Sequence, residues 1–290
     1  MKTMERSAAA SGTFKLGNDL PIHRLGFGAM RITGKGIWGE PENPDEARRV
    51  LRRAIELGIN FIDTADSYGP EVSERLIAEA LHPYPAGLVI ATKGGLTRQG
   101  PDRWAPVGRP EYIQQCVEMS LRRLRLERID LYQLHRIDPK VPVEETLGVL
   151  KELQHEGKIR HIGLSEVSTR EIKHAQKIVP IVSVQNRYNL VDREHEDVLN
   201  YCEEHNLGFI PWAPVASGDL AHPGGPLELA ARKYKATVSQ LSIAWLLHRS
   251  PVMLPIPGTS SVNHLEENVA AAILMLPKEE WQKIELAVAK

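Results

Sequence analysis

Cysteine is scarce in this sequence. Only two residues, Cys116 and Cys202, occur among 290, and both lie in stretches with helical periodicity. No CxxC pair and no Cys/His spacing typical of zinc ligands is present, which argues against a disulfide framework and against a metal site. We therefore expect each cysteine to be a small buried apolar residue, and we expect no bound metal.

Long apolar runs are also missing. No stretch approaches the ~18 consecutive apolar residues that a membrane-spanning helix needs. The first residues, MKTMERSAAASG, lack the apolar centre of a signal peptide, so residues 1–11 are expected to form a short flexible lead-in. These absences predict a cytoplasmic protein with no membrane partner.

Neither sign of charge is in excess. The 36 Lys and Arg residues nearly balance 37 Asp and Glu residues, which gives a formal net charge of −1. Such a balance gives no electrostatic reason to expect nucleic acid as the main partner. The 42% hydrophobic and 25% charged residues are typical of a globular protein with an ordinary core. The oligomeric state stays open.

Short apolar segments do alternate with amphipathic helical segments, and this happens eight times. Strands are expected at Leu25–Met30, Asn60–Ile62, Leu88–Thr92, Ile129–Leu134, Ile159–Leu164, Ile181–Val184, Gly208–Pro211 and Met253–Ile256. The helices between them include Pro44–Leu57, Val72–Leu81, Glu111–Leu124, Val143–Glu156 and Arg193–His205. Eight such units without a linker favour one α/β domain over residues 1–290, closed into a (β/α)8 TIM barrel.

Three additions to the barrel are expected. Thr13–Leu16 and Leu20–His23 flank a turn and predict an N-terminal β-hairpin. Pro226–Tyr234 and Val238–His248 give one helix more than the barrel needs after the seventh strand. A further helix, Lys278–Val288, is expected at the C-terminus.

Four titratable residues lie at or just after the ends of successive strands: Asp63, Tyr68, Lys93 and His135. Taken singly, each has an ordinary explanation as a helix cap, a packed ring, a solvated cation or a core residue. Active sites of such barrels form at the C-terminal ends of the strands, so together the four predict a catalytic group.

The chemistry of these residue types suits carbonyl reduction. A free tyrosine, with a pKa of about 10, is a poor acid at neutral pH. An adjacent ammonium lowers such a pKa by about 1–3 units, and Lys93 is expected to do this for Tyr68. Asp63 is expected to hold Lys93, and a neutral His135 to orient the carbonyl oxygen.

The sequence resembles the aldo-keto reductase family from LGFGAM to EENVAA. NFIDTADSYG, LHRIDPKVPVEET, HIGLSEVS, VQNRYN and PIPGTSS follow one another in the family's order. The resemblance places the family's catalytic tetrad on Asp63, Tyr68, Lys93 and His135. It implies an oxidoreductase that reduces an aldehyde or ketone by hydride transfer from NADPH, with Tyr68 as the proton donor.

The cofactor residues follow from the same resemblance, because no Rossmann fingerprint is present: Arg31 occupies the third glycine position after Gly26 and Gly28. The resemblance implies that Ser165 and Gln185 bind the nicotinamide carboxamide and that Trp212 stacks on the ring. For the pyrophosphate it implies Ser217, Gly218 and Leu220. For the adenosine 2′-phosphate the resemblance implies contacts from Gly258, Thr259, Ser260 and His264. For adenine it implies contacts from Glu267 and Asn268.

Two positions depart from the family pattern. Many members have Lys where Gly258 stands and Arg where His264 stands. The loss of both cations removes two charged contacts, worth about 1.5–3 kcal/mol each, to the phosphate that distinguishes NADPH from NADH. NADPH is the expected cofactor, and NADH remains possible.

The substrate pocket is expected to be lined by Met30, Trp38, Trp104 and Arg136, with Trp104 in a long loop over residues 94–109. Trp104 has an equal alternative role, that of anchoring this loop against the barrel. Aromatic or heterocyclic aldehydes suit two tryptophans, and resemblance to bacterial members that act on pyridoxal-like aldehydes makes these one candidate class.

Two rival functions are considered. Some relatives, including potassium-channel β subunits, hold the cofactor and act chiefly as regulatory partners or redox sensors, but here the tetrad is complete. A metal-dependent barrel hydrolase would need an HxH pair or clustered carboxylates. The first strand has neither, and Lys93 would repel a cation beside Asp63.

Overall fold

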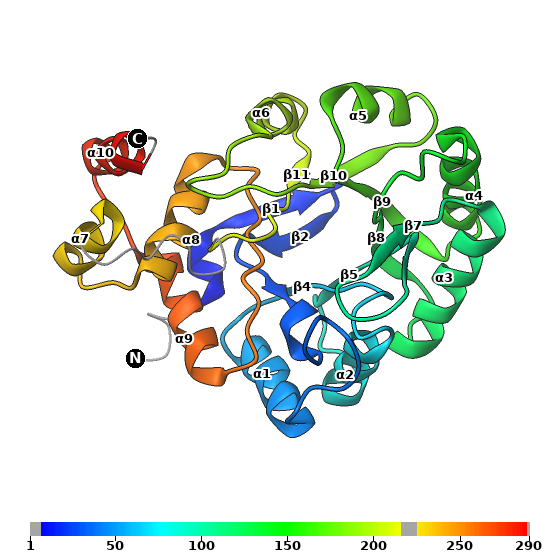
Figure 1. Cartoon of the computed structure of the whole chain (residues 1–290), viewed down its shortest axis with the longest axis horizontal. Coiled ribbons are helices and arrows are strands. Elements are labelled where there is room, and N and C mark those ends of the chain that lie inside the picture. The colour runs from blue at the N-terminus through cyan, green and yellow to red at the C-terminus, as the bar shows by residue number, and fades with distance from the viewer. Residues whose placement is uncertain (1–6, 216–224, 289–290) are drawn as a thin grey trace.

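A parallel sheet curled into a barrel organises this protein, whose computed structural model describes residues 7–215 and 225–288. Seven strands run in the order β11-β10-β9-β8-β5-β4-β3. Their bounds are β3 Phe27–Gly28, β4 Phe61–Asp63, β5 Val89–Gly94, β8 Ile129–Leu134, β9 Ile159–Ser165, β10 Ile181–Gln185 and β11 Gly208–Phe209. Helices lie around the outside of the strands (Figure 1).

The gap between β11 and β3 is closed by the segment Met253–Ile256. Leu254 N donates to Phe209 O (2.8 Å), and Gly26 N donates to Pro255 O (3.0 Å). This segment was expected to be the eighth strand, but it forms only an isolated bridge to Phe209. Proline lacks the N–H that a strand ladder requires, and Pro255 lies within the segment. The closed arrangement is the (β/α)8 barrel.

The helices agree closely with the sequence pattern. They are α1 Pro44–Glu56, α2 Val72–Leu81, α3 Pro110–Leu124, α4 Val143–His155, α5 Thr169–Ala175, α6 Glu196–Glu204, α7 Pro226–Lys233, α8 Val238–Arg249, α9 Val262–Ala270 and α10 Lys278–Val288. At the start of α1, Asn43 Oδ1 accepts from Glu46 N (3.0 Å) and Pro44 takes the first turn, where its missing N–H costs nothing. As expected, α7 and α8 follow β11, and α10 ends the described chain.

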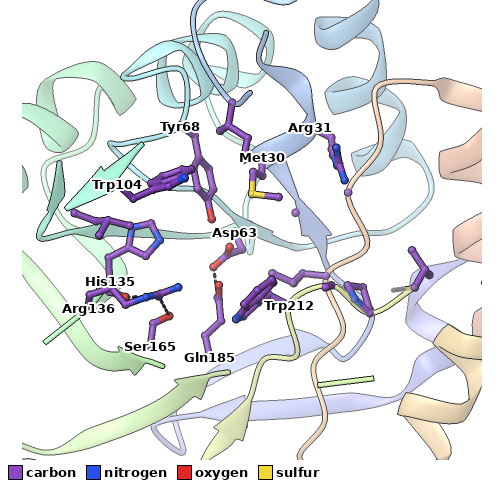
Figure 2. Close-up of a pocket in the computed structure, with 18 residues that line it drawn as sticks. Met30, Arg31, Asp63, Tyr68, Trp104, His135, Arg136, Ser165, Gln185 and Trp212 are labelled. Atoms are coloured by element: carbon purple, nitrogen blue, oxygen red, sulfur yellow. Dashed lines mark hydrogen bonds between the residues drawn. The ribbon is translucent and has the colours of Figure 1, made fainter. Parts of the chain in front are cut away.

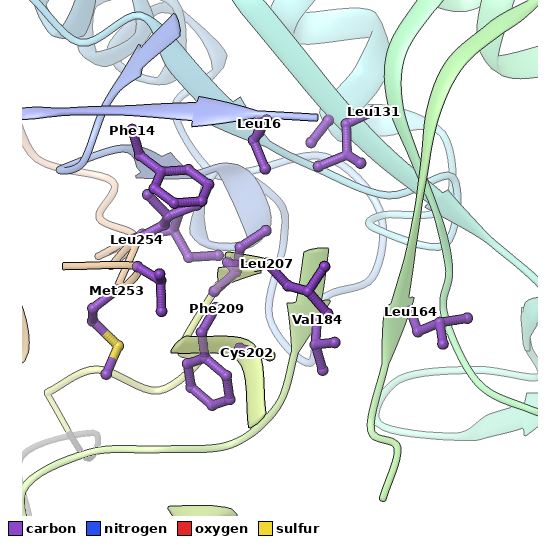
Figure 3. Close-up of a cluster of buried hydrophobic side chains, with 14 of the residues drawn as sticks. Phe14, Leu16, Leu131, Leu164, Val184, Cys202, Leu207, Phe209, Met253 and Leu254 are labelled. Atoms are coloured by element: carbon purple, nitrogen blue, oxygen red, sulfur yellow. The ribbon is translucent and has the colours of Figure 1, made fainter. Parts of the chain in front are cut away.

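The predicted hairpin closes one end of the barrel. Its strands, β1 (Thr13–Leu16) and β2 (Leu20–His23), are antiparallel, and alternate residues are buried. Figure 3 shows Phe14 and Leu16 beside Leu254 and Leu131, within one apolar cluster. The hairpin covers the end at which the strands begin, which leaves the opposite end free for a site.

The N-terminal segment differs from the expectation of a flexible lead-in to residue 11. Ala8–Ser11 form a 3₁₀ turn, Ala8 is buried, and its N–H donates to Leu57 O (2.9 Å). The missing apolar centre therefore did not mean flexibility over residues 7–11, because Ala8 is held against the end of α1. Residues 1–6 lie outside the described part of the chain.

The long segment after β5 has structure of its own. β6 (Leu96–Arg98) and β7 (Trp104–Pro106) form a small antiparallel ribbon, which the sequence pattern did not predict. Both cysteines are buried and free, as expected. Within residues 7–215 and 225–288, no helix is both long and apolar enough to cross a bilayer.

Candidate active site

A buried ammonium group connects three of the four residues singled out in the sequence. Lys93 Nζ, in β5, donates to Asp63 Oδ1 at the end of β4 (2.6 Å), to Thr64 O (2.8 Å) and to Tyr68 Oη (3.3 Å). Lys93 is 0% and Asp63 1% exposed. Since β4 and β5 are parallel neighbours, their carboxyl ends meet at the same rim. The barrel therefore places these groups together.

The carboxylate of Asp63 is fully engaged. Its other oxygen, Oδ2, accepts from Gln133 Nε2 and from Gln185 Nε2, both at 2.9 Å. A buried charge is tolerated only when it is paired and hydrogen-bonded, and the three contacts from Lys93, Gln133 and Gln185 meet that condition. Gln133 was not expected from the sequence, although its place opposite Lys93 in β8 puts it inside the barrel.

Protonation of Lys93 and Tyr68 follows from these contacts. Burial alone would lower the pKa of Lys93, but Asp63 and the phenol outweigh it and raise that pKa above its ordinary value. Burial raises the pKa of Tyr68, and the Lys93 ammonium offsets this only in part. Lys93 thus acts on the Tyr68 pKa in the expected direction, but the expected net lowering is not found, because desolvation of the phenolate is the larger effect. Tyr68 is a protonated phenol at neutral pH.

His135 follows β8 and faces Tyr68. The two rings meet edge to face, with centroids 5.9 Å apart and planes at 83°. Burial, assisted by the cations Lys93 and Arg136, lowers the pKa of His135 well below 6.5, so the imidazole is neutral as expected. Ser67 Oγ lies 3.3 Å from Nδ1. This contact leaves the other ring nitrogen available to a ligand.

These groups face a cavity of about 480 Å³ at the end of the barrel opposite the hairpin. Figure 2 shows Asp63, Tyr68 and His135 around its centre. Of the residues expected to bind cofactor or substrate, it is lined by Met30, Trp104, Arg136, Ser165, Gln185, Trp212 and Gly258. Lys93 lies behind the lining. Side chains that are far apart in the sequence thus converge on one cavity.

Trp104 and Trp38, which were both expected to line the substrate pocket, differ in their position relative to the cavity. Trp104, in β7, lines the cavity, and the Arg98 guanidinium lies 3.6 Å from its ring centroid, so this residue is both anchored and part of the wall. Trp38 is 38% exposed and does not line the cavity. Its neighbour Ile37 lines the cavity and has a positive φ of 55°. The expectation for Trp38 is therefore not met.

Trp212 lies on the opposite side of the cavity from Trp104 (Figure 2). Its Nε1 donates to Glu166, a residue that sequence reasoning did not single out. Glu166 Oε1 also accepts from Arg187 N (2.8 Å). These contacts fix the indole beside the cavity.

The residues expected around adenosine lie farther out. Gly258 lines the cavity, and a Cβ there would lie 2.5 Å from Gly28 O, so no larger residue fits. Thr259 is buried and accepts from Ser261 N (3.1 Å) through Oγ1. Beyond the cavity lining lie Thr259, Ser260, His264, Glu267 and Asn268. Ser217, Gly218 and Leu220 fall outside the described residues.

Arg31 is a cation that the sequence reading did not assign to the site. It lines the cavity near Gly258, where an added Cβ would lie 3.5 Å from Arg31 Cγ. Among the described residues it has no hydrogen bond or ion pair. The sequence signal that could have assigned Arg31 to the site is its position as a cation directly after the first expected barrel strand, Leu25–Met30. Over the same residues, no group of three or more His, Cys, Asp or Glu side chains is placed to hold a metal ion.

Comparison with known proteins agrees with this architecture. Residues 24–289 match the model of the Aldo/keto reductase family. The chain is 55% identical over 278 residues to an uncharacterised oxidoreductase of Schizosaccharomyces pombe, covering 96% of this chain and 90% of that protein. It is 41% identical over 276 residues to pyridoxine 4-dehydrogenase of Escherichia coli, covering 93% and 96%.

A solved structure shows the same fold. The aldo-keto reductase from Klebsiella pneumoniae in complex with NADPH superposes with a TM-score of 0.82 at 26% identity, covering 96% of this chain and 95% of that one. The match to the family model extends over nearly the whole described barrel. The chain belongs to the aldo/keto reductase family and is an oxidoreductase.

Proposed function

We propose that this protein reduces aldehydes or ketones to alcohols with NADPH, and that Tyr68 donates the proton. The observation that supports this most strongly is the position of Lys93 Nζ, bonded to both Asp63 and Tyr68 at the base of the cavity. Reduction of a carbonyl creates an alkoxide, which needs an acid and hydrogen-bond donors placed where that charge develops.

The residues around the cavity suit a nicotinamide dinucleotide. Ser165 and Gln185 offer polar groups to the carboxamide, and Trp212 offers an aromatic face to the ring. Arg31, beside Gly258, supplies a cation for the phosphates and makes up for the family cation that is missing at position 258. For the 2′-phosphate and adenine we retain Thr259, Ser260, His264, Glu267 and Asn268. The bound cofactor supplies the hydride.

The chain's own residues handle the proton. Ser67 Oγ lies 3.3 Å from Nδ1 of His135 and can donate to it. In the tautomer that this contact would favour, the neutral imidazole carries its proton on Nε2 and donates a hydrogen bond to the carbonyl oxygen. Tyr68 transfers its phenolic proton to the forming alkoxide. The Lys93 ammonium stabilises the phenolate that remains, and Asp63 keeps Lys93 charged and in place.

A carbonyl panel tests this function. The purified protein is mixed with aliphatic, aromatic and heterocyclic aldehydes, pyridoxal among them, and nucleotide oxidation is followed with NADPH and NADH in parallel. We expect turnover of at least one aldehyde and a higher kcat/KM for NADPH. Tight NADPH binding without turnover of any carbonyl would instead favour a regulatory or redox-sensing role.

The pKa shifts predict the pH dependence. Reduction needs Tyr68 protonated, which holds below a pKa raised above 10.0, and His135 neutral, which holds above a pKa lowered from 6.5. The kcat for reduction is therefore expected to stay constant between these two ordinary values. A pH profile at saturating aldehyde and NADPH measures it. A loss of kcat that titrates within this window would contradict the assigned protonation states.

A further inference from the structure

Arg136 is the residue directly after His135, and its guanidinium group faces the cavity. Nη1 donates to His135 O (2.6 Å) and to Ser165 Oγ (3.0 Å). A guanidinium carries five N–H donors, so these contacts leave Nε and Nη2 without a hydrogen-bond partner among the described residues. Figure 2 shows the group between His135 and Ser165, at the catalytic end of the cavity.

No described residue neutralises the positive charge of Arg136. Among the described residues that line the cavity, Asp63 is the one acidic side chain, and it is paired with Lys93. Glu166 lies close enough to act on Arg136 electrostatically, but it accepts from Trp212 Nε1 and Arg187 N. No ion pair of Arg136 occurs within residues 7–215 and 225–288. A desolvated cation without an anion is costly, which favours an anionic ligand at this place.

We propose that Arg136 binds an anionic group of the substrate, a carboxylate or a phosphate, so that the preferred substrates are aldehydes or ketones carrying such a group. This inference rests on the proposed function. The planar guanidinium fork matches both anions with two parallel hydrogen bonds. Tyr68 and His135 line the same cavity, so the anion and the reacting carbonyl belong to one small molecule.

The phosphates of the cofactor are a poor alternative partner for Arg136. Arg31 lies on the opposite side of the cavity (Figure 2). It is beside Gly258, where the chain leads towards Thr259 and α9. Arg136 instead contacts Ser165, which faces the uncharged nicotinamide in the proposed function. We therefore assign the Nε and Nη2 donors of Arg136, which have no partner among the described residues, to the substrate and not to the cofactor.

Matched substrate pairs test the proposal. One arm compares 4-carboxybenzaldehyde with benzaldehyde, and the other compares glyceraldehyde 3-phosphate with glyceraldehyde, all with NADPH. We expect the wild-type kcat/KM to favour the anionic member of at least one pair by about 10-fold or more, mainly through KM. That factor corresponds to one charge-assisted contact. The arm with the larger preference distinguishes carboxylate from phosphate.

Substitutions assign the preference to Arg136. In R136M the anionic-to-neutral ratio of kcat/KM is expected to fall about 10-fold, whereas R136K retains part of it because a point charge remains. The matched control is R31M, which removes the other arginine of the cavity and is expected to keep the ratio. NADPH affinity, measured by fluorescence, is followed in every variant.

Each outcome bears on one claim. Equal kcat/KM for both members of both pairs in the wild type would overturn the anion site, while the reductase assignment would stand. A ratio unchanged in R136M would place the anion elsewhere. A ratio that falls equally in R31M would show a general effect of charge and would also overturn the proposal. No turnover of any of the four aldehydes with NADPH would count against the proposed function itself.

Discussion

Replacing Lys93 with methionine is expected to lower the free energy of unfolding by about 3–5 kcal/mol and to abolish carbonyl reduction. The substitution leaves the carboxylate of Asp63 buried with only the two glutamine donors. Removing one partner of a buried ion pair has a cost of this size. Guanidinium unfolding followed by circular dichroism measures the loss of stability.

A double substitution separates stability from chemistry. Lys93→Met combined with Asp63→Asn removes both charges, so most of the lost stability is expected to return while activity stays absent. If the single Lys93→Met variant were as stable as the wild type, the pair would not be the buried, charged contact that its 2.6 Å distance indicates.

Tyr68→Phe is expected to lower kcat by about 10²–10⁴-fold, the usual contribution of a positioned acid. The ring keeps its packing against His135, and Lys93 keeps its bonds to Asp63 and Thr64, so the cavity retains its shape. NADPH affinity is expected to change little. Steady-state kinetics and a fluorescence titration measure the two quantities.

The control for Tyr68→Phe is Tyr84→Phe, which removes a phenol that donates to Leu124 O outside the cavity lining. Activity is expected to persist in that variant. Comparable turnover in Tyr68→Phe and wild type would mean that another acid protonates the alkoxide.

Much of the barrel was predictable because the hydrophobic periodicity of each strand and helix can be seen within a short stretch of sequence. The hairpin and α2 have the bounds that the pattern predicted, since alternation and helical spacing define them without distant contacts. The strand ends placed Asp63, Lys93 and His135 correctly at one rim for the same reason. The segment Met253–Ile256 was misjudged, because apolar character alone does not show that proline interrupts a ladder.

Features that depend on three-dimensional packing were not predictable. Trp38 is exposed and does not line the cavity, and the preceding Ile37 has a positive φ, which a β-branched residue rarely adopts. The pKa of Tyr68 depends on how completely the barrel buries it, and composition carries no such information. Arg31 lies beside Gly258 at the cavity, and Gln133 contacts Asp63 and Gln185. These neighbours are far away in the sequence, so the contacts could not be predicted from it.

The most direct test of Tyr68 as the proton donor is a single-turnover reaction. Enzyme loaded with NADPH is mixed with excess aldehyde in a stopped-flow instrument, and the loss of nicotinamide absorbance is followed for the wild type and for Tyr68→Phe. We expect rapid oxidation of bound NADPH in the wild type and a rate lower by about 100-fold or more in the variant. Equal rates with equal NADPH occupancy would contradict the assignment.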